Sequence, residues 1–459
     1  MPLAGKRRPP GTAREAALKA LVRFETEGAY LNLMLPSLLQ KLTADERSLA
    51  TRLAVGTVQH LNTLDWVINL YSRKSVDTFT PWIRNLLRLS AYQILYLDRI
   101  PGYAAVNEAV RLARRFGHRG VAGLVNALLR RVAEQAETLP WPDYEKDPVE
   151  YLSLRHSLPQ WLVSEAFDRW GFTETEHWCR ANNKRILISI RPNSLRIKPE
   201  SLIEKLRNEE VEAFQSPVVP GMLRVNPGLL PIFTSSFHEG LFTIQGESSA
   251  LVAPLLNPQE GETVIDLCSA PGGKTTHLAE LMKDRGLVYA VEINQNRMRM
   301  VEEAVARLGL QSVKFLSVDG RNIDRQDLPR PASVLVDAPC SGLGVIRRLP
   351  EIKWRRCKQD LYRLQKLQLE LLSAAARLLP PGGKLLYAVC SNQPEETDQV
   401  TAAFNSAHPG FIPEQLKTFL PPLLQKEQDH TGPVHIWPHR HEIDGFFIAL
   451  WRKKQPMEA

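Results

Sequence analysis

The feature that most constrains the fold is a regular alternation of short apolar runs and helical patterns from about residue 246 onward. The apolar runs include TVIDL (263–267), LVYAVE (287–292) and ASVLVDAP (332–339), and a helical pattern or a glycine-rich loop follows each run. Apolar strands that alternate with helices are typical of a parallel sheet covered on both faces. The sequence therefore predicts a doubly wound α/β domain, which binds its ligands at the carboxyl ends of the strands.

The earlier part of the chain divides by its patterns. Residues 12–135 carry apolar side chains at helical spacing, which predicts a helical bundle. Three prolines and no periodicity mark 137–148 as a linker. Short strand patterns mixed with helical ones over 150–245 predict a small α+β module. The predicted domains are 1–140, 141–245 and 246–455.

Charge is distributed unevenly along the chain. The net charge is +8, and residues 1–135 hold 20 Lys and Arg against 10 Asp and Glu. This excess favours a large polyanion, RNA or DNA, as the partner. The sequence has no apolar run near about 20 residues and no secretory signal, and its five cysteines form no CxxC pair. We therefore expect a cytoplasmic protein that does not span a membrane.

Carboxylates and thiols gather at the ends of five consecutive predicted strands. The strands end, in order, at Asp266, Glu292, Asp319, Asp337 and Cys390, and Cys340 lies just beyond the fourth. One such acidic residue would be explained as a helix cap or a turn residue. Because parallel strands end at one edge of a sheet, the whole set predicts a functional site there.

The loop CSAPGGKTT, 268–276, follows the first strand. Cys268 replaces the first glycine of the phosphate-binding pattern GxxxxGK[ST], and the loop does not match GxGxxG either. Its Gly–Gly turn lets a flat ligand lie against the backbone. Glu292 lies 19 residues beyond Gly273, the spacing at which an acidic side chain reaches ribose hydroxyls. With Asp319 placed to bind an adenine amino group, a nucleoside cofactor such as S-adenosylmethionine fits better than ATP.

The two strand-end cysteines predict covalent chemistry on a pyrimidine. A thiolate that adds to carbon 6 of cytosine makes carbon 5 a nucleophile toward an activated methyl group, and a base then removes the carbon 5 proton. A thiolate at neutral pH needs an electropositive setting. Nearby basic side chains are Lys274, Arg347, Arg348 and Lys353. The residue pattern alone leaves open whether Cys340 or Cys390 attacks.

Three motifs resemble those of the NOL1/NOP2/Sun family of RNA 5-methylcytosine methyltransferases: DLCSAPGGKTTHLAE, VDAPCSGLG with RRLPEIKW, and LLYAVCSNQPEE. DNA 5-methylcytosine enzymes share the Pro-Cys element but lack the second strand-end cysteine. The N-terminal third, with GTVQHLNTLDWVI and GLVNALLRR, resembles the antitermination factor NusB. Together these resemblances imply a multidomain protein: an all-α NusB-like RNA-binding bundle, a small RRM- or ferredoxin-like module that also binds RNA, and a Rossmann-like class I methyltransferase domain.

The resemblance also implies residue roles. Cys390 would be the nucleophile, Cys340 would assist proton removal and product release, and Asp337 would lie between the cofactor and the base. The residues implied to bind S-adenosylmethionine are Cys268, Ser269, Ala270, Pro271, Gly272, Gly273, Lys274, Glu292, Asp319 and Asp337. The basic stretch after the Pro-Cys turn is predicted to contact RNA phosphates through Arg347, Arg348, Lys353, Arg355 and Arg356.

The fusion of a NusB-like domain to this methyltransferase domain resembles an arrangement that implies 16S ribosomal RNA as the substrate. The implied target is a loop cytosine, cytosine 967. A monomer without a metal is expected. Three departures from the family pattern remove no reactive group: Val389 replaces a common Thr, Ser269 a common Ala, and QGESSA the usual QDEAS.

Other functions stay open at this stage. A cytosine methyltransferase with these motifs could act on another RNA, such as a tRNA, and a DNA methyltransferase is the closest chemical rival. A decayed catalytic domain would leave an RNA-binding or antitermination factor, which the intact strand-end carboxylates and thiols disfavour. Cys268, standing where a phosphate loop needs glycine, disfavours an RNA-dependent NTPase. Substrate and ATP-binding assays separate these alternatives.

Overall fold

The computed structural model describes residues 11–117, 119–226, 231–425 and 432–455. The chain forms two compact units. Unit 1 comprises the residues up to Lys184 together with a later segment, Arg347–Arg355, and unit 2 comprises Arg185–Ile346 and the residues from Arg356 onward. Each unit can hold more than one domain, so the domain boundaries expected near 140 and 245 stay predictions.

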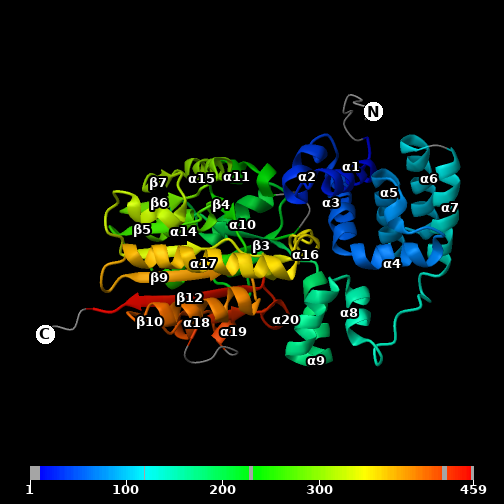
Figure 1. Cartoon of the computed structure of the whole chain (residues 1–459). Helices are drawn as coiled ribbons and strands as arrows, with labels where there is room; N and C mark the ends of the chain where they lie inside the picture. The colour runs from blue at the N-terminus through cyan, green and yellow to red at the C-terminus, as the bar shows by residue number, and fades with distance from the viewer. Residues whose placement is uncertain (1–10, 118, 227–230, 426–431, 456–459) are drawn as a thin grey trace. The chain divides into compact units, whose positions relative to one another are not determined.

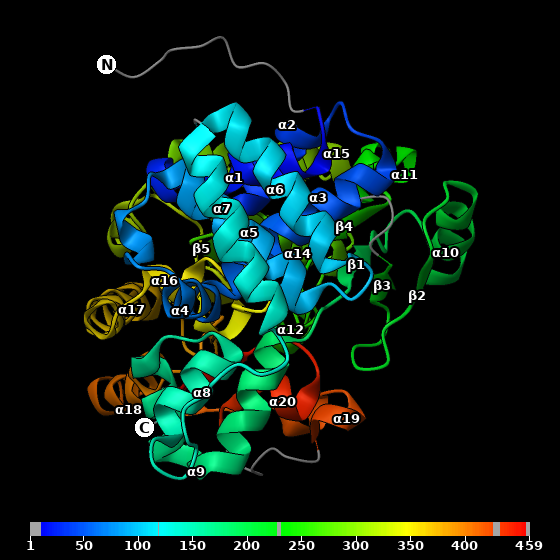
Figure 2. The same ribbon diagram turned by 90° about the vertical axis from the view of Figure 1, so that its right-hand side faces the viewer.

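Unit 1 is helical, as the sequence predicts (Figures 1 and 2). Its helices are α1 (Ala13–Glu27), α2 (Leu31–Leu39), α3 (Ala44–Gln59), α4 (Leu61–Tyr71), α5 (Pro81–Tyr96), α6 (Gly102–Phe116), α7 (Arg119–Glu134), α8 (Pro148–His156), α9 (Gln160–Asn183) and the short α16 (Ile352–Arg355). Helix α5 is central, because it packs against α1, α3, α4, α6 and α7. Its apolar side chains Leu86, Leu87 and Leu89 are fully buried in the core of this unit.

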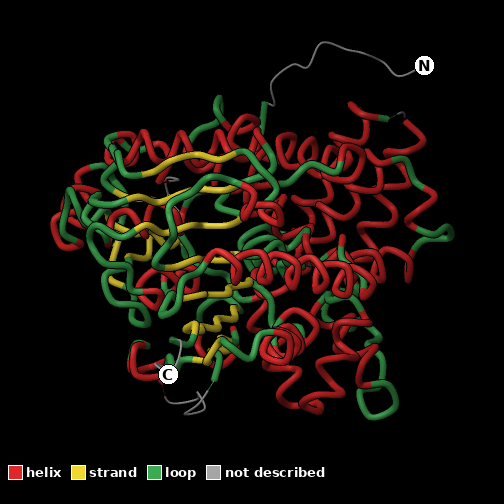
Figure 3. Tube along the Cα trace, turned by 60° about the vertical axis from the view of Figure 1, so that its left-hand side comes forward, coloured by secondary structure: helices red, strands yellow, loops and turns green. Residues whose placement is uncertain are grey.

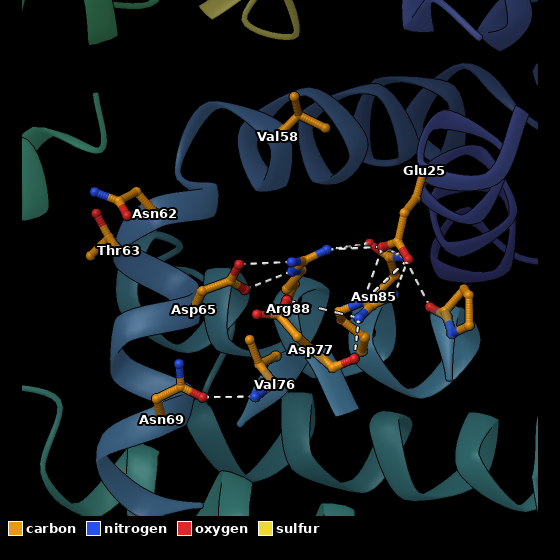
Figure 4. Close-up of polar contacts among 12 residues, drawn as sticks. Glu25, Val58, Asn62, Thr63, Asp65, Asn69, Val76, Asp77, Asn85 and Arg88 are labelled. Atoms are coloured by element: carbon orange, nitrogen blue, oxygen red, sulfur yellow. Dashed lines mark hydrogen bonds and ion pairs between the residues drawn. The ribbon is translucent and has the colours of Figure 1, made fainter. Parts of the chain in front are cut away.

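A network of charged side chains joins three helices of unit 1 (Figure 4). Arg88 on α5 donates from Nε to Asp65 Oδ1 of α4 at 2.6 Å and from Nη1 to Glu25 Oε2 of α1 at 3.0 Å. Asn85 Nδ2 donates to the same Glu25 oxygen at 2.8 Å. Arg88 is buried and its two carboxylate partners are partly exposed, so the buried charge is paired and the network links α1, α4 and α5.

The segment 347–355 reaches unit 1 from a distant part of the chain. The Lys353 side chain is buried, and its Nζ donates to the carbonyl oxygens of Gln59 at 2.8 Å and Ser157 at 2.6 Å. Trp354 Nε1 donates to the Val58 carbonyl at 2.6 Å, and its ring packs against the unit 1 core. The segment is therefore an integral part of this unit.

Unit 2 contains a large sheet, whose strands are yellow in Figure 3. Its strand order is β10-β12-β9-β8-β5-β6-β7, and β11 pairs with β12. The five strands β5 to β9 are parallel, and β12 runs antiparallel to β9. The strands are β5 (Thr263–Leu267), β6 (Leu287–Val291), β7 (Val313–Leu316), β8 (Ser333–Asp337), β9 (Lys384–Val389), β10 (Phe411–Pro413), β11 (Val434–Ile436) and β12 (Phe446–Lys453).

Helices cover both faces of this sheet, which confirms the predicted doubly wound fold. Val264 and Leu335 share a core with α14 (Gly273–Leu281) and α15 (Gln295–Leu308). Ile265 and Val336, one residue further along the same strands, share the other core with α17 (Lys358–Leu378) and α18 (Asp398–Ala407). Successive strand residues point to opposite faces, so both faces are apolar and the strands read as continuous apolar runs.

A smaller antiparallel sheet also belongs to unit 2. Its order is β2-β3-β1-β4, from β1 (Ile188–Pro192), β2 (Ala213–Gln215), β3 (Leu223–Val225) and β4 (Phe242–Ile244). Helix α10 (Pro199–Asn208) packs on this sheet through Leu202 and Leu206. The remaining helices of unit 2 are α11 (Ser235–His238), α12 (Glu247–Ala250), α13 (Val252–Leu256), α19 (Pro422–Gln425) and α20 (Pro438–His441).

A buried arginine links the small sheet to α14. Arg191, on β1, pairs through Nη2 with Glu280 Oε1 at 2.7 Å, and both side chains are buried. Its Nη1 donates to the Gly273 carbonyl at 2.7 Å, at the start of α14. The small sheet thereby contacts the helix that follows the glycine-rich loop. Among the described residues, no helix is long and apolar enough to cross a membrane.

Candidate active site at the carboxyl edge of the large sheet

The glycine-rich loop lies between β5 and α14. Cys268 and Gly272 both have positive φ, 64° and 101°. A Cβ at Gly272 would lie 3.2 Å from the Val301 Cα of α15, so only glycine gives the loop this conformation and this close approach. The loop is thereby held against α15.

Buried polar atoms around this loop lack protein partners. Asp266 is fully buried, and its Oδ2 accepts a hydrogen bond from Thr275 Oγ1 at 2.6 Å. Its Oδ1 and the Ser269 Oγ have no hydrogen-bond partner among the described residues, although both are buried. Burial raises the pKa of Asp266 to about 7. Buried polar atoms without a partner are rare in proteins, and a polar ligand bound in the loop would supply a partner for these two.

Glu292 follows β6 and is almost fully buried. Its Oε1 accepts from the Asn294 backbone N–H at 3.0 Å, and its Oε2 lies 3.4 Å from Arg297 Nη1. Arg297 Nη2 donates to the Ala270 carbonyl at 2.9 Å, so Arg297 links Glu292 to the glycine-rich loop. The motif reading did not single out Arg297, because it lies on α15 and carries no motif of its own.

Asp319 follows β7 and is held by an arginine. Its Oδ1 accepts from the Arg321 backbone N–H at 2.9 Å, and its Oδ2 accepts from Arg321 Nη2 at 2.6 Å. The hydrogen bonds from the Arg321 side chain lower the pKa of Asp319, which keeps the carboxylate ionised as an acceptor. Glu292 and Asp319 thus present two carboxylates on the neighbouring strands β6 and β7, an arrangement that fits a nucleoside.

The two thiols predicted to react lie side by side. Strands β8 and β9 are neighbours, and Asp337 pairs in register with Ala388, two residues before Cys390. The Cys340 Sγ and Cys390 Sγ atoms are 3.3 Å apart. The hydrogen bond with Cys390, together with burial, raises the pKa of Cys340 well above its usual value. Cys340 is therefore a neutral thiol that can donate to the Cys390 sulfur.

A lysine places positive charge beside these thiols. Lys274, in the first turn of α14, pairs through Nζ with Asp337 Oδ2 at 2.7 Å. Burial lowers the pKa of Lys274, but the Asp337 carboxylate outweighs burial and the net change is upward, so the ammonium stays charged. Lys274 also interacts electrostatically with Cys390. This ion pair links the start of α14 to Asp337 of β8, the strand that leads to Cys340.

One residue of the basic stretch after the Pro-Cys turn, Lys353, contradicts the prediction of RNA contact. Lys353, expected to meet RNA phosphates, is 2% exposed and bonds backbone carbonyls inside unit 1, so it has no surface to offer a phosphate. The Arg355 guanidinium lies over the Tyr30 ring at 4.4 Å and donates to the Ala29 carbonyl. Arg356 Nε donates to the Ser341 carbonyl at 2.9 Å, directly after Cys340. Arg347 and Arg348 also have interaction partners.

Comparison with known proteins supports all three predicted parts. Residues 253–452 match the family model for 16S rRNA methyltransferase RsmB/F, residues 11–134 match that of the NusB family, and residues 158–229 match the ferredoxin-like domain of RsmF/B-like methyltransferases. The probable ribosomal RNA small subunit methyltransferase B of Bacillus subtilis (strain 168) is 37% identical over 450 residues, which cover 96% of this chain and 99% of that protein.

Solved structures of other proteins share the fold of this chain. The crystal structure of PH0851 matches with a TM-score of 0.83 and 32% identity, covering 98% of this chain and 100% of its own. NSun6 from Pyrococcus horikoshii, solved with SFG, an analogue of S-adenosylmethionine, shares the fold with a TM-score of 0.57 and 24% identity, over 65% of this chain and 98% of its own. The family match over residues 253–452 and the similarity to methyltransferase B over nearly the whole chain confirm the predicted family and the predicted cofactor, S-adenosylmethionine. The chain belongs to the RsmB/Sun family of S-adenosylmethionine-dependent ribosomal RNA methyltransferases.

Proposed function

We propose that this chain methylates carbon 5 of a cytosine in 16S ribosomal RNA, cytosine 967 by family resemblance, through a covalent bond between Cys390 Sγ and carbon 6. The observation that carries the proposal is the 3.3 Å approach of the Cys340 and Cys390 sulfur atoms at the end of two neighbouring strands. The glycine-rich loop and Lys274 belong to the same edge. Methylation of a pyrimidine at carbon 5 needs a thiolate that adds to carbon 6 and a base that removes the carbon 5 proton, and these two thiols can fill the two roles.

The first step uses Cys390 as the attacking thiolate. Lys274 supplies the positive charge that a thiolate needs at neutral pH. The carboxylate of Asp337, held by Lys274, can accept a hydrogen bond from the cytosine N4 amino group, the pairing that acidic side chains make with this base. When Cys390 bonds to carbon 6, the ring electrons make carbon 5 nucleophilic, and S-adenosylmethionine supplies the methyl group that carbon 5 takes.

The second step uses Cys340 as the base. The raised pKa of Cys340 arises first from its hydrogen bond with Cys390 and then from burial. Formation of the carbon–sulfur bond consumes the Cys390 thiolate, so Cys340 can release its proton to solvent. The Cys340 thiolate then takes the carbon 5 proton, the double bond between carbons 5 and 6 re-forms, and the electron pair of the carbon–sulfur bond returns to Cys390.

The RNA contacts are proposed from charge and position. The basic excess of residues 1–135 favours a polyanion, and Arg347, Arg348, Arg355 and Arg356 are retained as candidate phosphate contacts. An unpaired loop cytosine can enter the site without the cost of opening a helix. A monomeric state and a cytoplasmic location stay predictions.

A methyl-transfer assay with isolated products tests the proposal. Full-length protein, tritiated S-adenosylmethionine and 16S ribosomal RNA should yield 5-methylcytidine on nucleoside analysis, and replacing cytosine 967 by uridine in the RNA should abolish it. Methylation of tRNA but not 16S RNA would assign another RNA substrate. Methyl transfer to DNA, or RNA binding without any transfer, would refute the proposal.

A further inference from the structure

A buried carboxylate near the two thiols has no part in the chemistry described above. Glu396 follows β9 in a short 3-10 turn, Pro394–Glu396, and it is fully buried. Its Oε1 accepts from the Ser341 backbone N–H at 2.7 Å and from Gln368 Nε2 at 3.2 Å. Its Oε2 accepts from the hydroxyl groups of Ser341 and Ser391. Four donors from three segments of the chain therefore converge on one carboxylate.

The two serines place this carboxylate between the reacting residues. Ser341 follows Cys340 directly, and Ser391 follows Cys390 directly. The hydroxyl groups of Ser341 and Ser391 are 3.2 Å apart, close to the 3.3 Å separation of the two sulfur atoms. One buried group thus fixes the turn that carries each thiol.

Glu396 is itself held in place. Its backbone carbonyl accepts from Tyr387 Oη at 2.7 Å, and Tyr387 is a fully buried residue of β9. Gln368 Nε2, besides its bond to Glu396, donates to the Pro339 carbonyl at 3.0 Å, just before Cys340. The carboxylate is therefore anchored to rigid elements of the sheet and of α17, as a group that positions others must be.

We infer that Glu396 is a positioning residue that sets the separation of the Cys340 and Cys390 sulfur atoms, an inference that rests on the roles proposed above for the two cysteines. Burial raises the pKa of Glu396, and the hydrogen bonds from Ser341 and Ser391 oppose this rise. In its ionised form the carboxylate only accepts hydrogen bonds, so it satisfies all four donors. An amide in its place would keep one acceptor and turn an NH₂ group toward donors. The change keeps the size of the side chain. It removes only the set of hydrogen bonds that Glu396 accepts from Ser341, Ser391 and Gln368, which we call the clamp.

The main test compares Glu396→Gln with Glu303→Gln, the same chemical change on the exposed face of α15. In single-turnover reactions at saturating RNA and cofactor, Glu396→Gln should lower the rate of methyl transfer about 10- to 100-fold, because small misplacements of reacting groups cost this much. The KM values for RNA and S-adenosylmethionine, measured in separate steady-state reactions, should stay unchanged. Glu303→Gln should match the wild type in every measurement.

Two serine variants remove the hydrogen bonds to Glu396 one at a time. They also test the inference if Glu396→Gln does not fold. Ser391→Ala should slow the appearance of the covalent protein–RNA complex, because it loosens the attacking thiol. Ser341→Ala should prolong the lifetime of that complex, because it loosens the thiol that completes release. If the serines had only a structural role, both variants would have a lower melting temperature. At temperatures below melting, the rate at which the covalent complex forms and the rate at which it decays would both match the wild type. This result would overturn the inference.

Alkylation without RNA separates this inference from the proposed function. The rates at which iodoacetamide modifies Cys340 and Cys390 in the wild type and in Glu396→Gln can be mapped by mass spectrometry. The clamp predicts that the ratio of the two rates changes in Glu396→Gln and not in Glu303→Gln. An unchanged ratio would refute the clamp even if methylation is confirmed, and a changed ratio without any methylation would refute the proposed function alone.

Discussion

Lys353 shows how strongly the surroundings of a side chain can change its pKa. The ammonium group is buried in unit 1 and faces two carbonyl oxygens instead of a carboxylate. Burial lowers the pKa of Lys353 from 10.5 to about 7. The segment RRLPEIKWRR reads as a basic surface in the sequence, because local pattern cannot reveal carbonyl groups that come from Gln59 and Ser157.

The lowered pKa of Lys353 predicts a pH dependence of stability. Between pH 7 and about 10.5 the unfolded chain carries a proton on Lys353 that the folded chain lacks. The free energy of unfolding should therefore rise with pH in this window, by at most about 1.4 kcal/mol per pH unit from this group, and the destabilisation is complete below about pH 7.

Urea denaturation at pH 7.5 and 9.5 measures this slope. Lys353→Met should show a smaller rise than the wild type, whereas Lys41→Met, which removes an exposed lysine of the same unit, should show the wild-type rise. Equal slopes in all three proteins would mean that Lys353 keeps an ordinary pKa.

At the scale of elements, the order of strands predicts most of the site. Asp266, Glu292 and Asp337 could be placed at one edge because parallel strands end together, and the structure brings them there. Glu396 and Arg297 could not be assigned, since their partners Ser341 and Ala270 lie 55 and 27 residues away and only tertiary packing brings them close.

The Arg191–Glu280 ion pair, which links β1 to α14, predicts the effect of a substitution on stability. Both side chains are buried, so Arg191→Ala leaves a buried carboxylate unpaired and should lower the free energy of unfolding by about 3–5 kcal/mol. The same variant should weaken cofactor binding, since Arg191 also holds the Gly273 carbonyl.

Denaturation of the double variant Arg191→Met/Glu280→Met provides the check. Replacing a buried ion pair by apolar groups is often close to neutral. We therefore expect the double variant to be more stable than Arg191→Ala. A double variant that is as unstable as the sum of the single losses would show that the two residues act independently.

The whole molecule is built from a chain that crosses between the two units three times, after Lys184, after Ile346 and after Arg355. The three sequence patterns predict a helical bundle, a small α+β module and a doubly wound α/β domain, because each part has its own periodicity, and the resemblance of the motifs to known families implies the NusB-like, ferredoxin-like and methyltransferase parts. They do not predict that a segment next to the Pro-Cys turn belongs to the helical unit, since that depends on contacts nearly 300 residues apart along the chain.

This connectivity predicts how a truncated chain behaves. A fragment 185–459 keeps the segment 347–355 but loses the core that buries Trp354 and Lys353. It should aggregate or bind hydrophobic dyes more than the full chain, because the apolar side chains of Leu349, Ile352 and Trp354 lose the helical unit that covers them. Replacing 347–355 in the fragment by a Gly/Ser linker of equal length should restore solubility. A soluble, dye-negative fragment with the native segment would contradict this prediction.

The central claim, that Cys390 attacks the base and Cys340 completes release, is tested most directly by the covalent complex. Cys390→Ala and Cys340→Ala, each mixed with 16S RNA and S-adenosylmethionine, are separated on denaturing gels. We predict no protein–RNA band for Cys390→Ala and a persistent band for Cys340→Ala, because attack survives there while proton removal fails. A persistent band for Cys390→Ala and none for Cys340→Ala would reverse the two roles and contradict the account.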